Sequence, residues 1–363
     1  LTAGQTYSFA VIGTGSTPTK DTYLYLENSL GVQIASDNDS GPNASSIITY
    51  TASSSGTYYL DVASNWSKSS QYSASQYGIS VTVGKKPNFD FSMGAGAVDA
   101  HSSWASSSAP TVITYGFRDT AANYTEPGSN IATFTRLTAA QMSAVNLAIK
   151  LWSDVAGIQF EQVNPGGYTN NATMLIGNYS DSTDGGGAFA LYPGSTAVTS
   201  SAGDVWLNTA NGISTSNANI GTYTYQTILH ELGHAIGLSH PGDYNATPGV
   251  TFTYANSAQF LQDSEQYSVM SYFNASNTGA VIPVDKIATP LMFDIVTLQN
   301  LYGANMTTRT GDTVYGFSGN AGTPYDFSTN TIPQYCIWDA GGSDALNCSG
   351  YKLSLIHISE PTR

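Results

Sequence analysis

The sequence predicts a multidomain protein: an all-β N-terminal sandwich, a central α+β domain and a short C-terminal segment rich in turns. Three observations predict this arrangement. Residues 1–85 contain only short stretches of alternating polarity, two long stretches with helical periodicity follow later, and residues 307–351 are again rich in Gly, Asp and Thr. We therefore expect domains at 1–85, 95–306 and 307–351, with a linker at 86–94.

In the first domain, strands are predicted by alternating apolar and polar residues between clusters of turn residues. The predicted strands are residues 5–12, 22–26, 31–35, 46–50 and 57–62. Turns are expected at 37–41 and 53–56, where Asp, Asn, Ser and Gly gather. Many short strands without a helix favour a small β-sandwich, and nothing in it is typical of catalysis.

The central domain alternates strands with two helices. The first helix is expected over 138–155, because Met142, Val145, Ile149 and Trp152 recur at helical spacing and Thr138 is a suitable cap. The second helix is expected over 223–238. Strands are expected at residues 111–117, 158–161, 173–176 and 204–208.

Composition excludes several classes of protein. The 11 Lys and Arg against 25 Asp and Glu give a net charge of −14, which disfavours nucleic acid and anionic membrane surfaces as partners. No apolar run reaches the roughly 18 residues that a membrane span requires. The 2 cysteines exclude a disulfide-rich scaffold and a thiolate metal cluster. We expect a secreted, extracellular monomer.

The two ends of the chain carry their own expectations. The chain does not begin with Met and shows no signal peptide, so we expect a processed or trimmed product. Residues 352–363 do not continue the pattern before them, and we interpret them, with His357, as a foreign tail.

The stretch from His230 to His240 carries the chemistry. Helix residues are about 100° apart, so His230 and His234 share one face, whereas Glu231 is rotated away and is free to act as a base toward water. On a continuous helix His240 would lie about 9 Å beyond His234, out of reach of a shared metal. Gly237 can end the helix and turn the chain back. The pattern predicts three zinc ligands, with a fourth position open for chemistry.

The plain alternative is a chance match on an amphipathic helix. Five fixed positions of the extended pattern are occupied, which makes that alternative the weaker one. Further along, Met270 alone would be interpreted as core filling and Tyr272 as an ordinary tyrosine. Near a zinc site the Tyr272 phenol is suited to approach the metal or to donate to a developing oxyanion.

The motifs HPGDYN at 240–245 and YSVMSY at 267–272 closely resemble the serralysins, which are secreted bacterial zinc endopeptidases of the metzincin clan. Further stretches agree with this resemblance: 151–155, 177–180, 203–206, 301–304 and 308–316. It covers roughly residues 95–351 and implies a metzincin catalytic domain with an active-site helix and a turn carrying Met270. It also implies one catalytic zinc ion and protein or peptide substrates.

The resemblance assigns a role to each matching residue. His230, His234 and His240 bind zinc, Glu231 is the general base, and Tyr272 contacts zinc at rest and stabilises the transition state. An edge strand pairs with extended substrates, and its matching residues are Gly187, Ala188, Phe189 and Ala190.

The resemblance also implies one or more structural calcium ions at the start of a β-roll. The matching oxygen donors are Arg309, Gly311, Thr313, Asp339, Gly341, Gly342 and Asp344. The family continues into tandem glycine-rich repeats, whereas this sequence shows only the first half-repeat. A disulfide between Cys336 and Cys348 is slightly favoured over two buried thiols, on the expectation that both lie on neighbouring strands of that roll.

The order of the predicted strands in residues 1–85, the strand with Tyr58 and Tyr59 and the turn at 37–39 resemble the pre-peptidase C-terminal-type β-domain of secreted bacterial peptidases. Two alternatives remain open from sequence. The chain would be a non-catalytic, calcium-dependent adhesion module if its two β-rich ends carried the function. Alternatively, residues 1–85 would act as an inhibitory propeptide that places a carboxylate such as Asp61 on the zinc.

Overall fold

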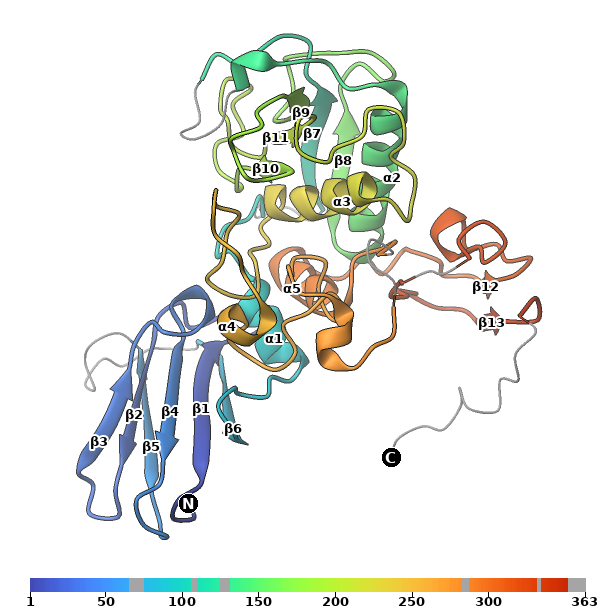
Figure 1. The fold of residues 1–363 in the computed structure, drawn as a ribbon. Coiled ribbons are helices and arrows are strands. Elements are labelled where there is room, and N and C mark those ends of the chain that lie inside the picture. The colour runs from blue at the N-terminus through green and yellow to red at the C-terminus, as the bar shows by residue number, and fades with distance from the viewer. Residues whose placement is uncertain (65–74, 106–109, 125–130, 283–286, 332–333, 352–363) are drawn as a thin grey trace.

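The computed structural model describes residues 1–64, 75–105, 110–124, 131–282, 287–331 and 334–351 (Figure 1). The expected tail at 352–363 lies outside the described residues. Within the described residues, no helix is both long enough and apolar enough to cross a membrane.

The N-terminal unit consists of two three-stranded antiparallel sheets, ordered β4-β1-β6 and β3-β2-β5. The strands are β1 Thr6–Gly13, β2 Thr22–Glu27, β3 Gln33–Asp37, β4 Ser46–Thr51, β5 Tyr59–Ser64 and β6 Tyr77–Val83. Side chains from both sheets, such as Phe9 and Leu24, form one shared apolar core. The five predicted strands are confirmed to within two residues, and β6 was missed.

The expected linker at 86–94 differs from the structure, because helix α1 (Phe91–Val98) begins inside it. Asp90 caps this helix by accepting a hydrogen bond of 2.9 Å from the Met93 amide. Phe89 is buried and stacks on Phe260 at 4.4 Å between ring centroids. The segment is therefore packed structure that joins the two parts of the chain.

The central part is built on a five-stranded sheet with the order β10-β11-β9-β7-β8. Strands β7 (Thr111–Phe117), β8 (Ile158–Gln162), β9 (Met174–Tyr179) and β11 (Val205–Asn208) are parallel neighbours, whereas β10 (Ala188–Ala190) is antiparallel to β11. Two helices, α2 (Ala139–Val155) and α3 (Tyr223–Ala235), pack on each other and on this sheet around a common core. Thr138 caps α2 as predicted.

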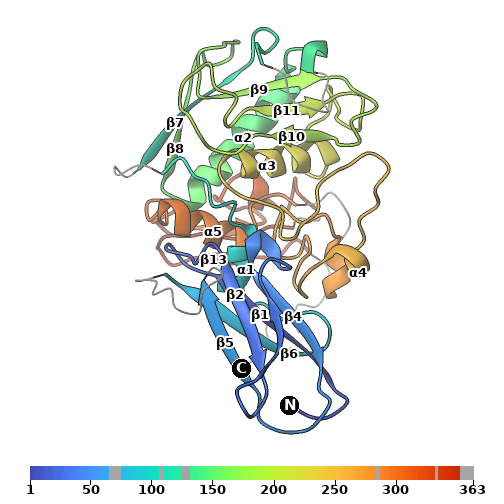
Figure 2. The same cartoon turned by 90° about the vertical axis from the view of Figure 1, so that its left-hand side faces the viewer.

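Helices α1 and α5 (Met292–Tyr302) lie between the N-terminal sheets and the central sheet (Figures 1 and 2). The shorter elements are α4 (Tyr254–Ser257), the parallel pair β12 (Val314–Gly316) and β13 (Ala345–Asn347), and four 3-10 turns at Pro42–Ala44, Ile131–Thr133, Ala275–Thr278 and Thr323–Tyr325. Ala10 and Ile12 of β1 belong to the same core as α3 and α5, so the N-terminal unit has a fixed position on the rest.

Candidate metal and active site

Helix α3 ends where the histidine pattern requires it to end. Gly237 has a φ of 108° and follows the C-cap residue Ile236. The Gly237 amide donates to the His234 carbonyl at 3.0 Å, and the Leu238 amide donates to the Gly233 carbonyl at 2.9 Å. This pair of bonds is the Schellman motif, which satisfies the last helical carbonyls and reverses the chain. The predicted turn at Gly237 is confirmed.

The turn brings the three histidine side chains together. His240 Nε2 lies 3.2 Å from His230 Nε2 and 3.1 Å from His234 Nε2. The Nδ1–H of each ring donates to a backbone carbonyl. His230 donates to Val269 at 2.8 Å, His234 to Leu238 at 2.6 Å and His240 to Tyr244 at 2.8 Å. These bonds leave three Nε2 lone pairs directed at one point.

The donor set fits a zinc ion. Burial lowers the pKa of His230 to about 4 and that of His234 to about 3, so both imidazoles are neutral, as metal binding requires. Zn–N bonds of about 2.0–2.1 Å in tetrahedral geometry need nitrogen atoms a little over 3 Å apart. Among the described residues, this is the only group of three or more His, Cys, Asp or Glu side chains that can share an ion.

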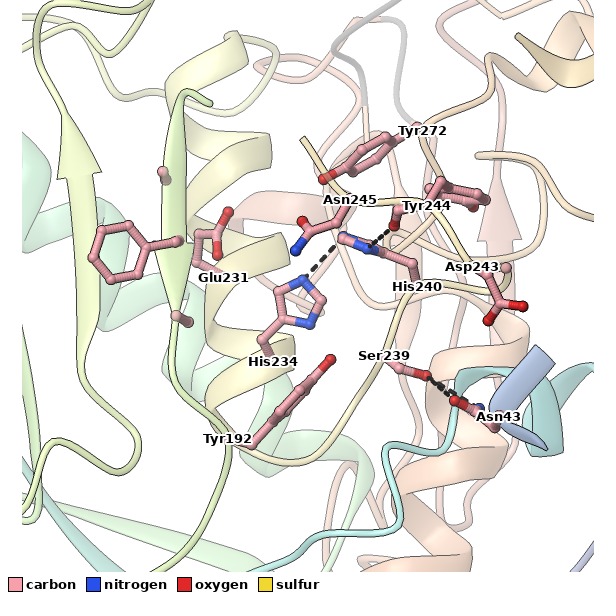
Figure 3. A pocket seen from close by; sticks show the side chains of 14 residues that line it. Asn43, Tyr192, Glu231, His234, Ser239, His240, Asp243, Tyr244, Asn245 and Tyr272 are labelled. Carbon is pink, nitrogen blue, oxygen red and sulfur yellow. Dashed lines mark hydrogen bonds between the residues drawn. The ribbon is translucent and has the colours of Figure 1, made fainter. Parts of the chain in front are cut away.

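Glu231 lies beside the three histidines but does not belong to their group. Its side chain is buried, its Oε2 has no hydrogen-bond partner within the structure, and burial raises its pKa to about 8. Figure 3 shows the carboxylate next to His234 at the cavity. A buried carboxylate with a vacant oxygen is suited to hold and deprotonate a water molecule.

Tyr272 faces the same centre. Its ring centroid lies 4.5 Å from that of His240, and its Oη accepts a hydrogen bond of 3.3 Å from the Ala246 amide. Desolvation, followed by the nearby charge of Glu231, raises the pKa of Tyr272, so its hydroxyl is a proton donor. Tyr192, which sequence reasoning missed, meets His234 edge to face, with 5.7 Å between the two ring centroids.

Met270 lies directly under the active-site helix. It is fully buried, and a Cβ added to Gly233 would lie only 2.6 Å from its Sδ. The turn is held by Asp294 of α5, whose carboxylate accepts from Ser268 Oγ at 2.5 Å and the Val269 amide at 2.9 Å. Sequence reasoning missed Asp294, because it lies 24 residues downstream in a helix that the pattern did not reveal.

A second buried carboxylate supports the His240 loop. Asp263 accepts hydrogen bonds of 2.8 Å from Tyr244 Oη and from Ser271 Oγ. The Tyr244 carbonyl in turn accepts from His240 Nδ1. Asp263 therefore helps to position His240 through Tyr244. No pattern around Asp263 in the sequence indicated this role.

Two cavities flank Glu231 and Tyr272 along strand β10. One has a volume of about 390 Å³ and the other about 470 Å³, and both are lined by Ala188. Strand β10 is the edge strand of its sheet, as predicted, and Gly187 precedes it with its carbonyl bonded to the Asn208 amide at 2.9 Å. An extended peptide lying along β10 would pass from one cavity to the other.

The residues predicted for calcium come from two loops that lie together. Arg309, Gly311 and Thr313 precede β12, whereas Asp339, Gly341, Gly342 and Asp344 precede β13. The Thr313 amide donates to Asp344 Oδ1 at 2.9 Å, and the Arg309 guanidinium is engaged by Asp154 at 2.8 Å. The two loops that carry the predicted oxygen donors are thus held side by side.

The expected disulfide is wrong: Cys336 and Cys348 are free. Cys336 lies beside the segment at 287–289, and its amide donates to Thr289 Oγ1 at 2.8 Å. Cys348 follows β13, whose partner is β12. The two cysteines are therefore not on neighbouring strands.

Two family profiles match the chain. The matrixin profile matches residues 129–273, and the profile of the peptidase M10 serralysin C terminus matches residues 304–359. Over both matched segments the chain is similar to the serralysin-type metallopeptidases. The second match includes most of the segment that we interpreted as a foreign tail.

Serralysin relatives agree with both matches. Serralysin B of Dickeya chrysanthemi is 37% identical over 315 residues, which are 83% of this chain and 62% of that protein. The metallopeptidase AprA of Pseudomonas marginalis is 40% identical over 246 residues, which are 66% of this chain and 50% of that protein. Serralysin G of Dickeya chrysanthemi is 38% identical over 259 residues, which are 67% of this chain and 51% of that protein. The chain thus spans between half and two thirds of the length of these relatives.

Proposed function

We propose that this protein is a secreted zinc endopeptidase that hydrolyses internal peptide bonds of protein or peptide substrates. The observation that carries the proposal is the convergence of three neutral imidazole Nε2 atoms beside the unpartnered Glu231 carboxylate. His230, His234 and His240 would hold the zinc ion, which supplies Lewis-acid polarisation of the scissile carbonyl and activates water.

The protein's own groups carry the remaining steps. Glu231 takes a proton from the attacking water and delivers it to the leaving amine, because its carboxylate is the vacant acceptor at the site. Tyr272 donates its hydroxyl proton in a hydrogen bond to the developing oxyanion. Strand β10 hydrogen-bonds the substrate main chain, which gives affinity with little side-chain selectivity.

Two alternatives from the sequence receive no support. A non-catalytic adhesion module does not account for an intact Glu231 next to an open metal position. For an inhibitory propeptide, Asp61 would have to reach the histidines. Asp61 instead lies in β5 opposite Tyr25 and is not among the residues lining either cavity.

The remaining features extend the proposal. We infer that residues 1–85 form a β-sandwich domain, residues 95–306 the peptidase domain and residues 307–351 the calcium-binding start of a β-roll. The pairing of the loops before β12 and β13 supports the last of these, since carboxylates and freed glycine carbonyls are calcium ligands.

Glu231→Gln tests the proposal. The purified variant should bind one zinc ion per chain but cleave casein at least about a hundredfold more slowly, because the amide cannot accept the proton from water. The wild-type protein should lose activity with a zinc chelator and regain it with zinc. Wild-type turnover by a zinc-loaded Glu231→Gln variant would refute the mechanism.

A further inference from the structure

The N-terminal unit reaches the catalytic cavity. Asn43, in the 3-10 turn between β3 and β4, lines the 390 Å³ cavity together with Glu231 and His240. Figure 3 shows Asn43 beside Ser239, with Asp243 above it. This turn is the part of residues 1–85 that contributes to the lining of that cavity.

Two ties hold the turn against the loop that carries His240. Asn43 Nδ2 donates to the Ala97 carbonyl at 2.8 Å and to Ser239 Oγ at 3.2 Å. Gln259 Nε2 donates both to the Ser40 carbonyl and to Asp243 Oδ2, each at 2.9 Å. Asn43 has a φ of 52°, a left-handed conformation that asparagine adopts more readily than most residues. The wall formed by this turn is therefore fixed.

The position of β10 assigns this cavity to one side of the scissile bond. Ala190 and Tyr192 line the cavity of Asn43, whereas residues 185–187 line the other cavity. Antiparallel strand pairs outnumber parallel pairs two- to threefold, so an antiparallel substrate is the favoured arrangement. Its N-terminal residues then lie toward Ala190, on the side of Asn43.

The charge at this end of the cavity is negative. Asp243 is exposed, and no ion pair engages it among the residues that the structure describes. The cavity lining contains no Lys or Arg. A basic side chain of the substrate would meet an available carboxylate here.

We propose that the 40–44 turn and Asp243 together form a substrate subsite for a basic side chain, on the N-terminal side of the scissile bond. This proposal rests on the proposed peptidase function. It makes the N-terminal unit part of the substrate site and Asn43 a specificity-determining residue.

Three fluorogenic peptides with the same residues around the cleaved bond test the subsite. The short peptide has two residues before that bond, and the long peptides add either two Arg or two Glu. The wild-type kcat/KM should be highest for the Arg peptide. In Asp243→Asn, the ratio of kcat/KM between the Arg and Glu peptides should fall about threefold to fivefold through KM, the size expected for an exposed ion pair.

Asn43→Gly keeps the left-handed conformation accessible and removes the side chain. The ratio of kcat/KM between the Arg peptide and the short peptide should fall about threefold. The matched control is Asn164→Gly, since Asn164 also has a positive φ of 56° and donates to a carbonyl but follows β8 at the opposite edge of the sheet. That control should keep the wild-type ratio.

The outcomes separate the possibilities. If Asn43→Gly lowers kcat/KM equally for the short and Arg peptides, the turn only braces the His240 loop and the subsite is refuted. A wild-type ratio in both test variants also refutes it. A wild-type protein that cleaves none of the peptides, nor casein, would instead contradict the proposed function itself.

Discussion

The proposed role of the Tyr272 hydroxyl is to donate a hydrogen bond to the developing oxyanion. Its ring centroid lies 4.5 Å from that of His240, and its Oη accepts a hydrogen bond from the Ala246 amide. Tyr272→Phe should lower kcat about tenfold or more with little change in KM, because only the transition state loses a donor. Steady-state kinetics on one peptide measures this. The control is Tyr168→Phe, which removes a hydroxyl bonded to the Leu137 carbonyl. An unchanged kcat for Tyr272→Phe would mean that Tyr272 only contributes to packing.

Asp263 makes the stability of the folded protein depend on pH. Burial outweighs the hydrogen bonds from Ser271 and Tyr244 and raises the pKa of Asp263 to about 7, against about 3.9 for an unperturbed aspartate. The unfolded chain therefore ionises this group first, so its contribution to stability is full below about pH 4 and is lost as the pH rises toward 7.

Replacing Asp263 by Asn should remove that dependence. The free energy of unfolding of Asp263→Asn, minus that of the wild type, should rise steadily between pH 4 and 7. Because Asp263 Oδ2 has no hydrogen-bond partner in the structure, an amide NH2 in its place would also be unsatisfied. We therefore expect the variant to lose, in addition, a constant amount of unfolding free energy at every pH. Urea unfolding at four pH values measures the difference. A difference that stays flat across this range would contradict the raised pKa.

At the scale of the element, the end of α3 decides whether the third ligand arrives. A Cβ on Gly237 would lie 2.2 Å from the Ser102 carbonyl oxygen, and its φ of 108° disfavours any other residue. Gly237→Ala should therefore destabilise the protein by at least about 1–3 kcal/mol and weaken zinc binding, because His240 must move.

A second glycine allows the cost of backbone strain to be measured without a steric clash. Gly166 has a φ of 77°, but an added Cβ would have nothing within 4 Å. Gly166→Ala should show the cost of backbone conformation alone and leave zinc affinity unchanged. Zinc competition with a chelating dye, together with urea unfolding, reports both effects. Equal zinc affinity in the two variants would mean that the turn does not position His240.

The elements that could be predicted are those whose signals are local. Thr138 and a clean apolar period identify α2, and the histidine pattern with Gly237 identifies α3 and its end. Helix α1 was missed because its sequence, FSMGAGAV, contains two glycines that disfavour helix, and tertiary packing on α5 overrides that preference. Helix α5 was missed because apolar residues surround it on several sides, which removes the one-faced pattern.

At the scale of the whole molecule, long-range contacts place the remaining site residues. Asn43 meets Ser239 across a separation of 196 residues. No local pattern signals such a contact, because it depends on how α1 packs on β1: a Cβ on Gly96 would lie 2.1 Å from the Gly13 carbonyl oxygen. The convergence of the three histidines was predictable because one helix and one turn carry them all, whereas the cavity wall needs the complete fold.

We expect the segment after α5 to depend on the proposed calcium for its stability. Its only sheet among the described residues is the two-stranded pair β12 and β13, and such a pair is marginal by itself. The two loops in front of these strands carry Asp339, which accepts a hydrogen bond from Tyr315 Oη, and Asp344, which accepts one from the Thr313 amide of the other loop. Calcium at a hundred times its dissociation constant would add about 2.7 kcal/mol to the folded loops.

Removal of calcium should therefore loosen residues 307–351 before it affects α3. With a chelator that prefers calcium over zinc, limited proteolysis should cut within this segment first, while zinc stays bound to the three histidines. Asp344→Asn should show the same early cut even with calcium present. The ion pair between Arg309 and Asp154 of α2 should keep the cut fragment attached until salt is raised, because screening weakens that contact. Identical cleavage rates with and without calcium would refute a calcium site in these loops.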